Sequence, residues 1–377
     1  MKALVLGRGK SGKAAEARLR EQGYEVEFDE GYDLVVASPG LPVKSELQLG
    51  CEELKRRGWK LLAVTGSKGK SSVVKVVADA LNLAGFHAVA CGNYGLPVCD
   101  VAFPSSSDRS VAKSNWAVVE VSSFMLETTT LPSDTFEAAA ILNLQEDHLD
   151  RHGGVDVYHA LKRKLLTFAK RGIDGTEFAG GEVKPSLWAG SYFDNGVLSG
   201  NAACAVELMR AAGLDDGAIA RAFRDFVPLP HRMNEVAEIG GVRYVDDSKA
   251  TSIAALVAGV EMASDPRSPS LISHPSVRLI AGGLPKGDDP KIALPILTKR
   301  VRKVYLIGQS AEEFFKAWNS AVDCEICGTM ERAVECAKRE AEKGDCVLLS
   351  PGTASFDQFK SFGERGEVFA GLVKKGK

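Results

Sequence analysis

Residues 61–72 read Leu-Leu-Ala-Val-Thr-Gly-Ser-Lys-Gly-Lys-Ser-Ser. The apolar start of this stretch predicts a buried strand, and the pattern over Val73–Ala84 predicts a helix. Between them, glycines allow successive backbone N–H groups to face one anion, Lys70 supplies a positive charge, and a hydroxyl such as that of Ser71 can ligate Mg²⁺. The stretch therefore predicts a phosphate-binding loop between a strand and a helix.

The composition is that of a large soluble enzyme. The chain has 377 residues, of which 45% are hydrophobic, and a formal net charge of −2. No apolar run reaches the roughly 18 residues of a membrane helix, and Met1–Leu6 is too short for the apolar part of a signal peptide. The basic residues are spread along the chain, which argues against a nucleic-acid surface. We expect a cytoplasmic monomer that acts on small molecules, without a membrane or nucleic-acid partner.

The cysteines follow the pattern of reduced, buried thiols. There are eight, and most lie in apolar or helical segments. Cys324 and Cys327 form one Cys-x-x-Cys pair, for which zinc binding and redox chemistry both stay open. No second pair at zinc-finger spacing accompanies it.

Strand and helix patterns alternate in three blocks, which predicts an α/β protein with parallel sheets. We expect a Rossmann-like domain over residues 1–59, a central P-loop ATPase-like domain with a parallel or mixed sheet over 60–228, and a Rossmann-like domain over 229–377. The prolines of Pro228-Leu229-Pro230 suggest a hinge between the last two. Three further expectations are a strand at Leu34–Ala37, a helix over Tyr158–Ala169 and a closing helix over Ser355–Lys374.

The first block contains a dinucleotide-type fingerprint. Gly7-Arg8-Gly9-Lys10-Ser11-Gly12 follows a predicted strand, and Asp29 ends the next one, where a ribose-binding acid would lie. Taken alone, this segment favours a nicotinamide- or flavin-dependent enzyme. The physical argument, however, establishes only that a diphosphate could bind at the start of the following helix.

Candidate catalytic groups follow two strands of the central block. Glu120 ends the apolar strand around Ala117–Val119, at the sheet edge where α/β proteins bind their ligands. His148 follows the strand predicted over Ala138–Asn143, and its spacing from His152 leaves a helical zinc pair open. Lys162 lies in a helical pattern, and its spacing alone favours a solvated basic stripe.

Several motifs, taken in order, resemble one family. They are Thr65-Gly66-Ser67-Lys68-Gly69-Lys70-Ser71, Gly92-Asn93-Tyr94-Gly95, Glu120-Val121-Ser122-Ser123-Phe124, Asn143-Leu144-Gln145-Glu146-Asp147-His148, Tyr158-His159-Ala160-Leu161-Lys162, Leu229-Pro230-His231-Arg232, Asp247-Ser248-Lys249-Ala250-Thr251 and Ser350-Pro351-Gly352-Thr353-Ala354-Ser355-Phe356-Asp357-Gln358-Phe359. The compact loop is similar to that of the Mur ligases and the folylpolyglutamate synthases. The last two motifs resemble those of the Mur ligases that add D-glutamate.

This resemblance implies a reaction of peptidoglycan synthesis. ATP would phosphorylate the alanyl carboxylate of UDP-N-acetylmuramoyl-L-alanine, and the amine of D-glutamate would displace phosphate from the acyl phosphate, leaving ADP and phosphate. The alternatives are another amide ligase, such as a folylpolyglutamate synthase, and an NAD-dependent oxidoreductase that uses Gly7–Gly12. An oxidoreductase would have no use for Lys70, Glu120, His148 and Lys162 together.

The resemblance also implies the residues of the site. Catalysis would involve Lys70, Glu120, His148 and Lys162. ATP would contact Gly66, Ser67, Lys68, Gly69, Lys70, Ser71, Ser72, Asn201, Arg232 and Asp247. The UDP substrate would contact Lys10, Ser11, Ser38, Asn93 and Ser122, and D-glutamate would contact Lys249, Thr251, Lys286, Ser355 and Phe362.

Two Mg²⁺ ions are implied as well, with ligands drawn from Ser71, Glu120, His148 and Lys162. In similar enzymes the matching lysine carries a carbamate formed from CO₂, which converts a cation into an anion that can bind Mg²⁺. Only a neutral amine reacts with CO₂, so Lys162 would need a lowered pKa. The sequence also departs from the family pattern. Ser67-Lys68 replaces a Thr-Asn pair, and Met125 stands where a glutamine is usual.

Overall fold

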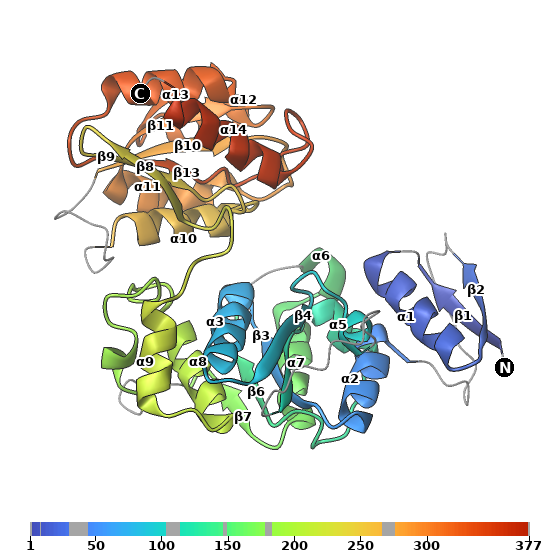
Figure 1. Cartoon of the computed structure of the whole chain (residues 1–377). Coiled ribbons are helices and arrows are strands. Elements are labelled where there is room, and N and C mark those ends of the chain that lie inside the picture. The colour runs from blue at the N-terminus through green and yellow to red at the C-terminus, as the bar shows by residue number, and fades with distance from the viewer. Residues whose placement is uncertain are drawn as a thin grey trace. The chain divides into compact units, whose positions relative to one another are not determined.

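The computed structural model describes residues 2–7, 9–29, 44–102, 114–145, 149–177, 183–265 and 276–375 (Figure 1). The chain forms two compact units, one of residues 1–189 with 198–226 and the other of residues 190–197 with 227–377. The described residues contribute three sheets, which confirms the predicted α/β class. In this part of the chain no helix has the length and apolar character needed to cross a bilayer.

The smallest sheet has the start of a Rossmann-like pattern. Strand β1 (Lys2–Leu6) pairs in parallel with β2 (Glu25–Asp29), and helix α1 (Lys10–Glu21) connects them. A Cβ atom at Gly12 would lie 1.9 Å from the carbonyl oxygen of Gly7, so this glycine allows the helix to pack closely on the preceding turn. The strand predicted at Leu34–Ala37 lies outside the described residues.

The central sheet has five parallel strands in the order β4-β5-β3-β6-β7. Its inner strands are buried along most of their length, as parallel strands covered by helices on both faces must be. The bounds are β3 (Lys60–Thr65), β4 (His87–Gly92), β5 (Asn115–Glu120), β6 (Ala138–Ile141) and β7 (Gly172–Asp174).

Helices cover this sheet, and α3, the helix that follows β3, packs against α8 and α9 (Figure 1). The helix predicted over Tyr158–Ala169 is shorter than expected, because α7 passes into a 3₁₀ turn, η1, at Leu165. The described bounds are α2 (Glu46–Arg56), α3 (Lys70–Leu83), α4 (Val98–Ala102), α5 (Ser123–Thr128), α6 (Leu149–His152), α7 (Val155–Lys164), η1 (Leu165–Phe168), η2 (Pro185–Leu187), α8 (Ser199–Ala211) and α9 (Asp216–Arg224).

The second unit is built on a six-stranded sheet in the order β12-β11-β10-β13-β9-β8, in which only the β8–β9 pair is antiparallel. Neighbouring residues of one strand face opposite apolar cores, as Leu279 and Ile280 of β10 do. The strands are β8 (Asn234–Ile239), β9 (Val242–Asp246), β10 (Val277–Gly282), β11 (Val301–Ile307), β12 (Asp323–Gly328) and β13 (Cys346–Leu349). The helices are α10 (Ile253–Ala263), η3 (Pro290–Ala293), α11 (Leu294–Arg300), α12 (Ala311–Trp318), α13 (Met330–Glu340) and α14 (Phe362–Lys374).

The closing helix begins later than the prediction placed it. The predicted start was Ser355, but α14 begins at Phe362, and the Ser361 hydroxyl caps it by accepting a hydrogen bond from the Glu364 N–H at 3.1 Å. Ser355 instead lies buried in a turn, where its carbonyl accepts from the Phe359 N–H. The predicted start of the closing helix at Ser355 is therefore wrong.

Candidate active site

The predicted phosphate loop lies between β3 and α3, where parallel sheets present their ligands (Figure 1). Gly69 precedes the helix with φ of 80°, a left-handed conformation that favours glycine. Asn143, which follows β6, holds the loop from the neighbouring strand end. Its Oδ1 accepts from the Lys68 N–H, and its Nδ2 donates to the Lys68 carbonyl, both at 2.9 Å.

Two lysines converge on one carbonyl oxygen of this loop. The Nζ atom of Lys70 lies 2.7 Å from the Gly66 oxygen, and the Nζ atom of Lys162 lies 2.9 Å from the same oxygen. Lys162 is only 1% exposed, and its Nζ also lies 4.5 Å from the centroid of the Tyr158 ring. The solvated basic stripe that spacing alone favoured is therefore wrong for Lys162. Two lysine side chains thus lie beside a glycine-rich loop, where the charge of Lys70 suits phosphate.

Glu120 lies next to this loop at the end of β5. It is 2% exposed, and it aligns across the sheet with Val64, two residues before Gly66. The Asn93 amide donates to its Oε1 at 2.8 Å, whereas its buried Oε2 has no hydrogen-bond partner among the described residues. A buried carboxylate oxygen without a protein partner fits a site that completes its coordination with a cation.

The donor set around the loop agrees with a hard divalent cation. Ser71 occupies the second position of α3, directly after Lys70, and Glu120 offers an oxygen. His148 lies outside the described residues. His152 does not support the zinc pair, because its Nε2 lies 3.0 Å from the Ser123 hydroxyl and its Nδ1 lies 3.2 Å from a carboxylate oxygen of Glu127.

The residues expected to contact the UDP substrate occupy different local settings. Lys10 and Ser11 are exposed in the first turn of α1, which is the place expected for a diphosphate. Asn93 is bound to Glu120, and the Ser122 hydroxyl caps α5 by accepting from the Met125 N–H at 3.3 Å. Ser38 lies outside the described residues.

Gly69→Ala is expected to weaken ATP binding at least about tenfold. A Cβ atom at this position would lie 2.0 Å from Nδ2 of Asn201, so the loop or Asn201 must move. The left-handed backbone adds a further cost of about 1–2 kcal/mol for alanine. Gly58→Ala is the matched control, since Gly58 has φ of 76° with no atom within 4 Å of its added Cβ. Calorimetric titration with ATP should separate the two variants, and equal affinities would contradict the predicted clash.

A second group of predicted residues gathers in the other unit. Asp247 follows β9 and is 8% exposed, and its Oδ2 accepts from the Ser350 hydroxyl at 2.9 Å. Burial raises the pKa of the Asp247 carboxyl to about 7, although the Ser350 hydrogen bond and the nearby positive charge of Arg232 favour the ionised form. Oδ2 of the neighbouring Asp246 lies 2.7 Å from Nδ1 of His231 and accepts a hydrogen bond from it when Nδ1 carries the proton.

This pKa makes a testable contribution to stability. Because folding raises the Asp247 pKa from about 4 to about 7, the folded chain binds a proton that the unfolded chain has released between these pH values. As pH rises from 4 to 7, the unfolding free energy of the parent should therefore fall relative to that of Asp247→Asn. The difference should change by up to about 1.4 kcal/mol per pH unit. Urea unfolding at several pH values measures it. Asp225→Asn, at an exposed carboxylate, is the control, and a flat difference for Asp247→Asn would contradict the assignment.

The residues expected to bind the amino acid form two contact pairs. The Nζ atom of Lys249 lies 4.1 Å from the centroid of the Phe362 ring, and Lys286 donates to the Thr251 carbonyl at 3.2 Å. Ser355 lies one residue beyond Ala354, which pairs with Leu284 close to Lys286. Residues from four separate stretches of sequence are thus brought to one region of this unit.

Two residues that support the site were absent from the predicted set. Asn143 holds the phosphate loop and also donates to Asn201 Oδ1 at 3.0 Å. Arg365 is fully buried and donates to the carbonyls of Ser248, Thr353 and Ala354, so it ties the segments before Lys249 and Ser355 together. Asn143 begins a motif that the sequence displayed, whereas the pattern around Arg365 contained no signal.

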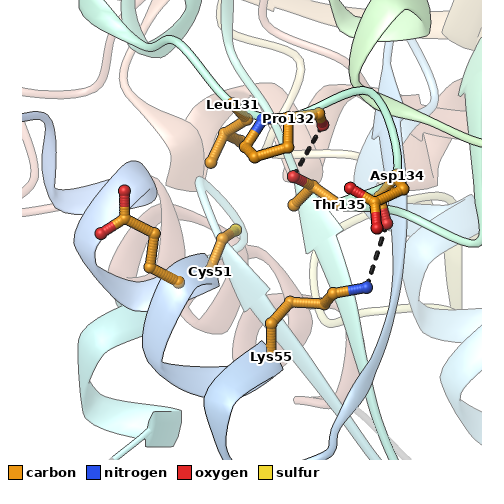
Figure 2. A pocket seen from close by; sticks show the side chains of 7 residues that line it. Cys51, Lys55, Leu131, Pro132, Asp134 and Thr135 are labelled. Atoms are coloured by element: carbon orange, nitrogen blue, oxygen red, sulfur yellow. Dashed lines mark hydrogen bonds between the residues drawn. The ribbon is translucent and has the colours of Figure 1, made fainter.

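A small pocket lies away from these groups (Figure 2). It has a volume of about 220 Å³ and lies between α2 and the segment around Leu131–Thr135. Lys55 donates to the Asp134 carbonyl at 3.0 Å, and the Thr135 hydroxyl donates to the Pro132 carbonyl at 2.8 Å. None of the predicted site residues lines it, so it is not the candidate active site.

The fold and the matched regions define the class of the protein. A family described as Mur ligase middle domain matches residues 64–174, and one described as Mur ligase, glutamate ligase domain, matches residues 231–352. Among solved structures, MurF ligase from Thermotoga maritima in complex with ADP has a TM-score of 0.63 at 18% identity, covering 99% of this chain and 94% of that one. MurC from the same organism has a TM-score of 0.63 at 14% identity, and each chain is covered over 100% of its length. The chain has the three-domain Mur ligase fold.

Curated relatives narrow the assignment. A UDP-N-acetylmuramoylalanine–D-glutamate ligase from Dechloromonas aromatica is 34% identical over 91% of this chain and 84% of its own length. One from Acidobacterium capsulatum is 31% identical over 99% of this chain and 96% of its own length. The chain belongs to the family of UDP-N-acetylmuramoylalanine–D-glutamate ligases. Membership in a ligase family excludes the oxidoreductase alternative and disfavours the folylpolyglutamate synthase alternative.

Proposed function

We propose that this protein joins D-glutamate to UDP-N-acetylmuramoyl-L-alanine at the expense of ATP, as a cytoplasmic step of peptidoglycan synthesis. The observation that carries this proposal is the approach of the Lys70 and Lys162 Nζ atoms to one carbonyl oxygen of the phosphate loop, beside the unpartnered Oε2 of Glu120. A lysine cation together with a buried carboxylate that can hold a metal ion suits phosphoryl transfer, in which positioning and charge neutralisation supply most of the catalysis.

We assign the three substrates to three stretches of the chain. Residues 1–59 bind the UDP part of the substrate, residues 60–228 bind ATP, and residues 229–377 bind D-glutamate and close over the nucleotide. The glycine turn before α1 supports the first assignment, and the loop before α3 supports the second. We propose that the protein works as a monomer.

In the proposed first step, the alanyl carboxylate attacks the γ-phosphorus of ATP, and ADP leaves. Lys70 neutralises charge on the β- and γ-phosphates. Backbone and hydroxyl groups of the loop surround the same phosphates. They come from the backbone of Gly66, Ser67, Lys68 and Gly69 and from the side chains of Ser71 and Ser72. Asn201, whose side chain lies against Gly69, is assigned to the ATP site as well. Arg232 is suited to phosphate and Asp247 to the ribose hydroxyls.

In the second step, the amine of D-glutamate attacks the acyl phosphate and phosphate leaves from the tetrahedral intermediate. The two carboxylates of D-glutamate call for cations and hydroxyl donors, and Lys249, Lys286, Thr251 and Ser355 supply these groups near Phe362. The UDP substrate is assigned to Lys10, Ser11, Ser38, Asn93 and Ser122.

Two Mg²⁺ ions would be held by Ser71, Glu120, His148 and a carbamate on Lys162. When bound, they would neutralise charge on the transferring phosphate. The Lys162 amine is buried against a carbonyl and an aromatic ring, so its charged form lacks full hydration. A neutral Lys162 amine would react with CO₂ to give a carbamate and a proton.

Phosphate release tests the proposal. The protein is supplied with ATP, Mg²⁺ and UDP-N-acetylmuramoyl-L-alanine, and D-glutamate, L-glutamate, D-aspartate and L-lysine are added in parallel. Release that requires both the UDP substrate and D-glutamate is the expected result. Lack of turnover by protein that still binds ATP would overturn the substrate assignment.

A further inference from the structure

The Cys-x-x-Cys pair of the sequence is divided between two faces of the C-terminal sheet. In strand β12, Cys324 belongs to one apolar core and Cys327 to the other, because side chains three positions apart in a strand face opposite sides. The pair therefore cannot act together as the sequence pattern suggested. Glu325, two positions before Cys327, shares its face.

Helix α13 adds a third group to that face. Cys336 lies on the buried side of α13 and is 4% exposed, while Cys327 is 6% exposed. One ligand atom from each of Glu325, Cys327 and Cys336 lies within 4.8 Å of the other two. Cys336 Sγ lies 3.4 Å from Oε1 of Glu325.

These separations approach those of a tetrahedral metal site. With Zn–S bonds of about 2.3 Å and Zn–O bonds of about 2.1 Å, tetrahedral geometry separates two sulfurs by about 3.8 Å and a sulfur from an oxygen by about 3.6 Å. The distance of 3.4 Å between Cys336 Sγ and Glu325 Oε1 is already close to the sulfur–oxygen value. No two ligand atoms are more than 4.8 Å apart, so a side-chain movement of about 1 Å would bring all three to tetrahedral distances.

Positively charged side chains lie beside this cluster and would compensate the negative charge of its ligands. Lys303 Nζ lies 2.9 Å from Oε2 of Glu325, and an Arg332 nitrogen lies 4.0 Å from Oε1. Since Lys303 engages Oε2, the other oxygen is left facing the sulfurs, where it can serve as a ligand.

We propose that Glu325, Cys327 and Cys336 bind one thiophilic divalent cation of the zinc class, with a water or small ligand in the fourth position. Two sulfur ligands select such a cation over Mg²⁺, which prefers oxygen. The site is separate from the phosphate loop and does not depend on the proposed reaction.

The site also has a structural consequence. Gly328, which ends β12, accepts hydrogen bonds from the Gln358 side chain at 2.8 Å and from the Gly308 N–H at 3.0 Å. A cation that links β12 to α13 would stabilise the end of β12, to which the Gln358 side chain is hydrogen-bonded. We expect the melting temperature of the protein to rise when the cation binds.

Co²⁺ titration of the reduced, full-length protein in saturating Mg²⁺ tests the proposal. The excess Mg²⁺ competes for the oxygen ligands near the phosphate loop, and only thiolate coordination gives a sulfur-to-cobalt charge-transfer absorbance. One equivalent of Co²⁺ should produce this absorbance and raise the melting temperature. Cys327→Ser and Cys336→Ser should each lose it, with at least a tenfold loss of Co²⁺ affinity, and Glu325→Gln should weaken binding.

Cys324→Ser is the matched control, since this buried cysteine lies three residues away on the other face, and it should bind as the parent does. A cooperative thermal unfolding transition in each variant verifies folding, and the partly exposed Glu325 provides a test if a serine variant fails to fold. The proposal would be overturned if the parent showed no such absorbance. It would also be overturned if the absorbance persisted in both the Cys327→Ser and Cys336→Ser variants, or if Cys324→Ser lost it.

Discussion

Lys162→Met is expected to lower kcat for phosphate release by about a thousandfold, the scale seen when a charged group that stabilises a transition state is removed. Methionine has nearly the same length and tolerates burial, so the fold should survive. If the side chain acts as a carbamate, the parent should also lose activity when CO₂ is removed and regain it with bicarbonate, whereas Lys162→Met should respond to neither. Steady-state assays with and without bicarbonate measure both effects.

Lys164→Met is the control for this substitution. Lys164 lies two positions further along α7, and its Nζ donates to the Leu126 carbonyl at 2.9 Å, away from the phosphate loop. We expect this variant to retain most of the parent's activity and its response to bicarbonate. Comparable losses in the two lysine variants would show that α7 is needed only for folding, and would contradict a catalytic Lys162.

Glu120→Gln is expected to lower kcat by about a hundredfold to a thousandfold and to raise the Mg²⁺ concentration needed for half-maximal rate. Glutamine keeps the size of the side chain and an oxygen that can accept from Asn93 at the position of Oε1. It removes the negative charge that the unpartnered Oε2 would offer to a cation. Activity measured across a range of Mg²⁺ concentrations gives both parameters.

Glu137→Gln provides a comparison within the same unit. Glu137 is a partly buried carboxylate next to β6 whose oxygens accept from the exposed Lys170 at 2.9 Å. Loss of such a surface ion pair should change stability by less than about 1 kcal/mol and leave the Mg²⁺ requirement unchanged. An unchanged Mg²⁺ requirement in Glu120→Gln as well would argue that Glu120 serves only as a partner for Asn93.

Local patterns were enough to predict the central fold. The strand β3, the loop with Gly69, and the helix that follows are adjacent in sequence, and their propensities and apolar spacing agree. The α/β class followed from the same alternation. The boundary of α14 was not predictable in this way, because a polar stretch such as Ser355–Ser361 contains more than one serine able to cap a helix.

For Lys162, the sequence spacing and the folded structure give different surroundings. Helical spacing placed it among neighbouring basic residues, which usually point to solvent. In the fold it is buried, because α7 packs beside the loop before α3 and the lysine finds a carbonyl at Gly66. Only the resemblance of its motif to a family, and not the spacing, anticipated this.

The sequence by itself determined the α/β class, the phosphate loop and the family to which the chain belongs, since each depends on short motifs whose residues are close together. The tertiary structure alone decided that Asn143 holds the loop, that Arg365 joins distant segments, and that Cys327 faces Cys336 instead of Cys324. These contacts join residues that are far apart in the chain or on different elements. Their pairing is set by strand order and by the face on which each side chain emerges, which no local pattern specifies.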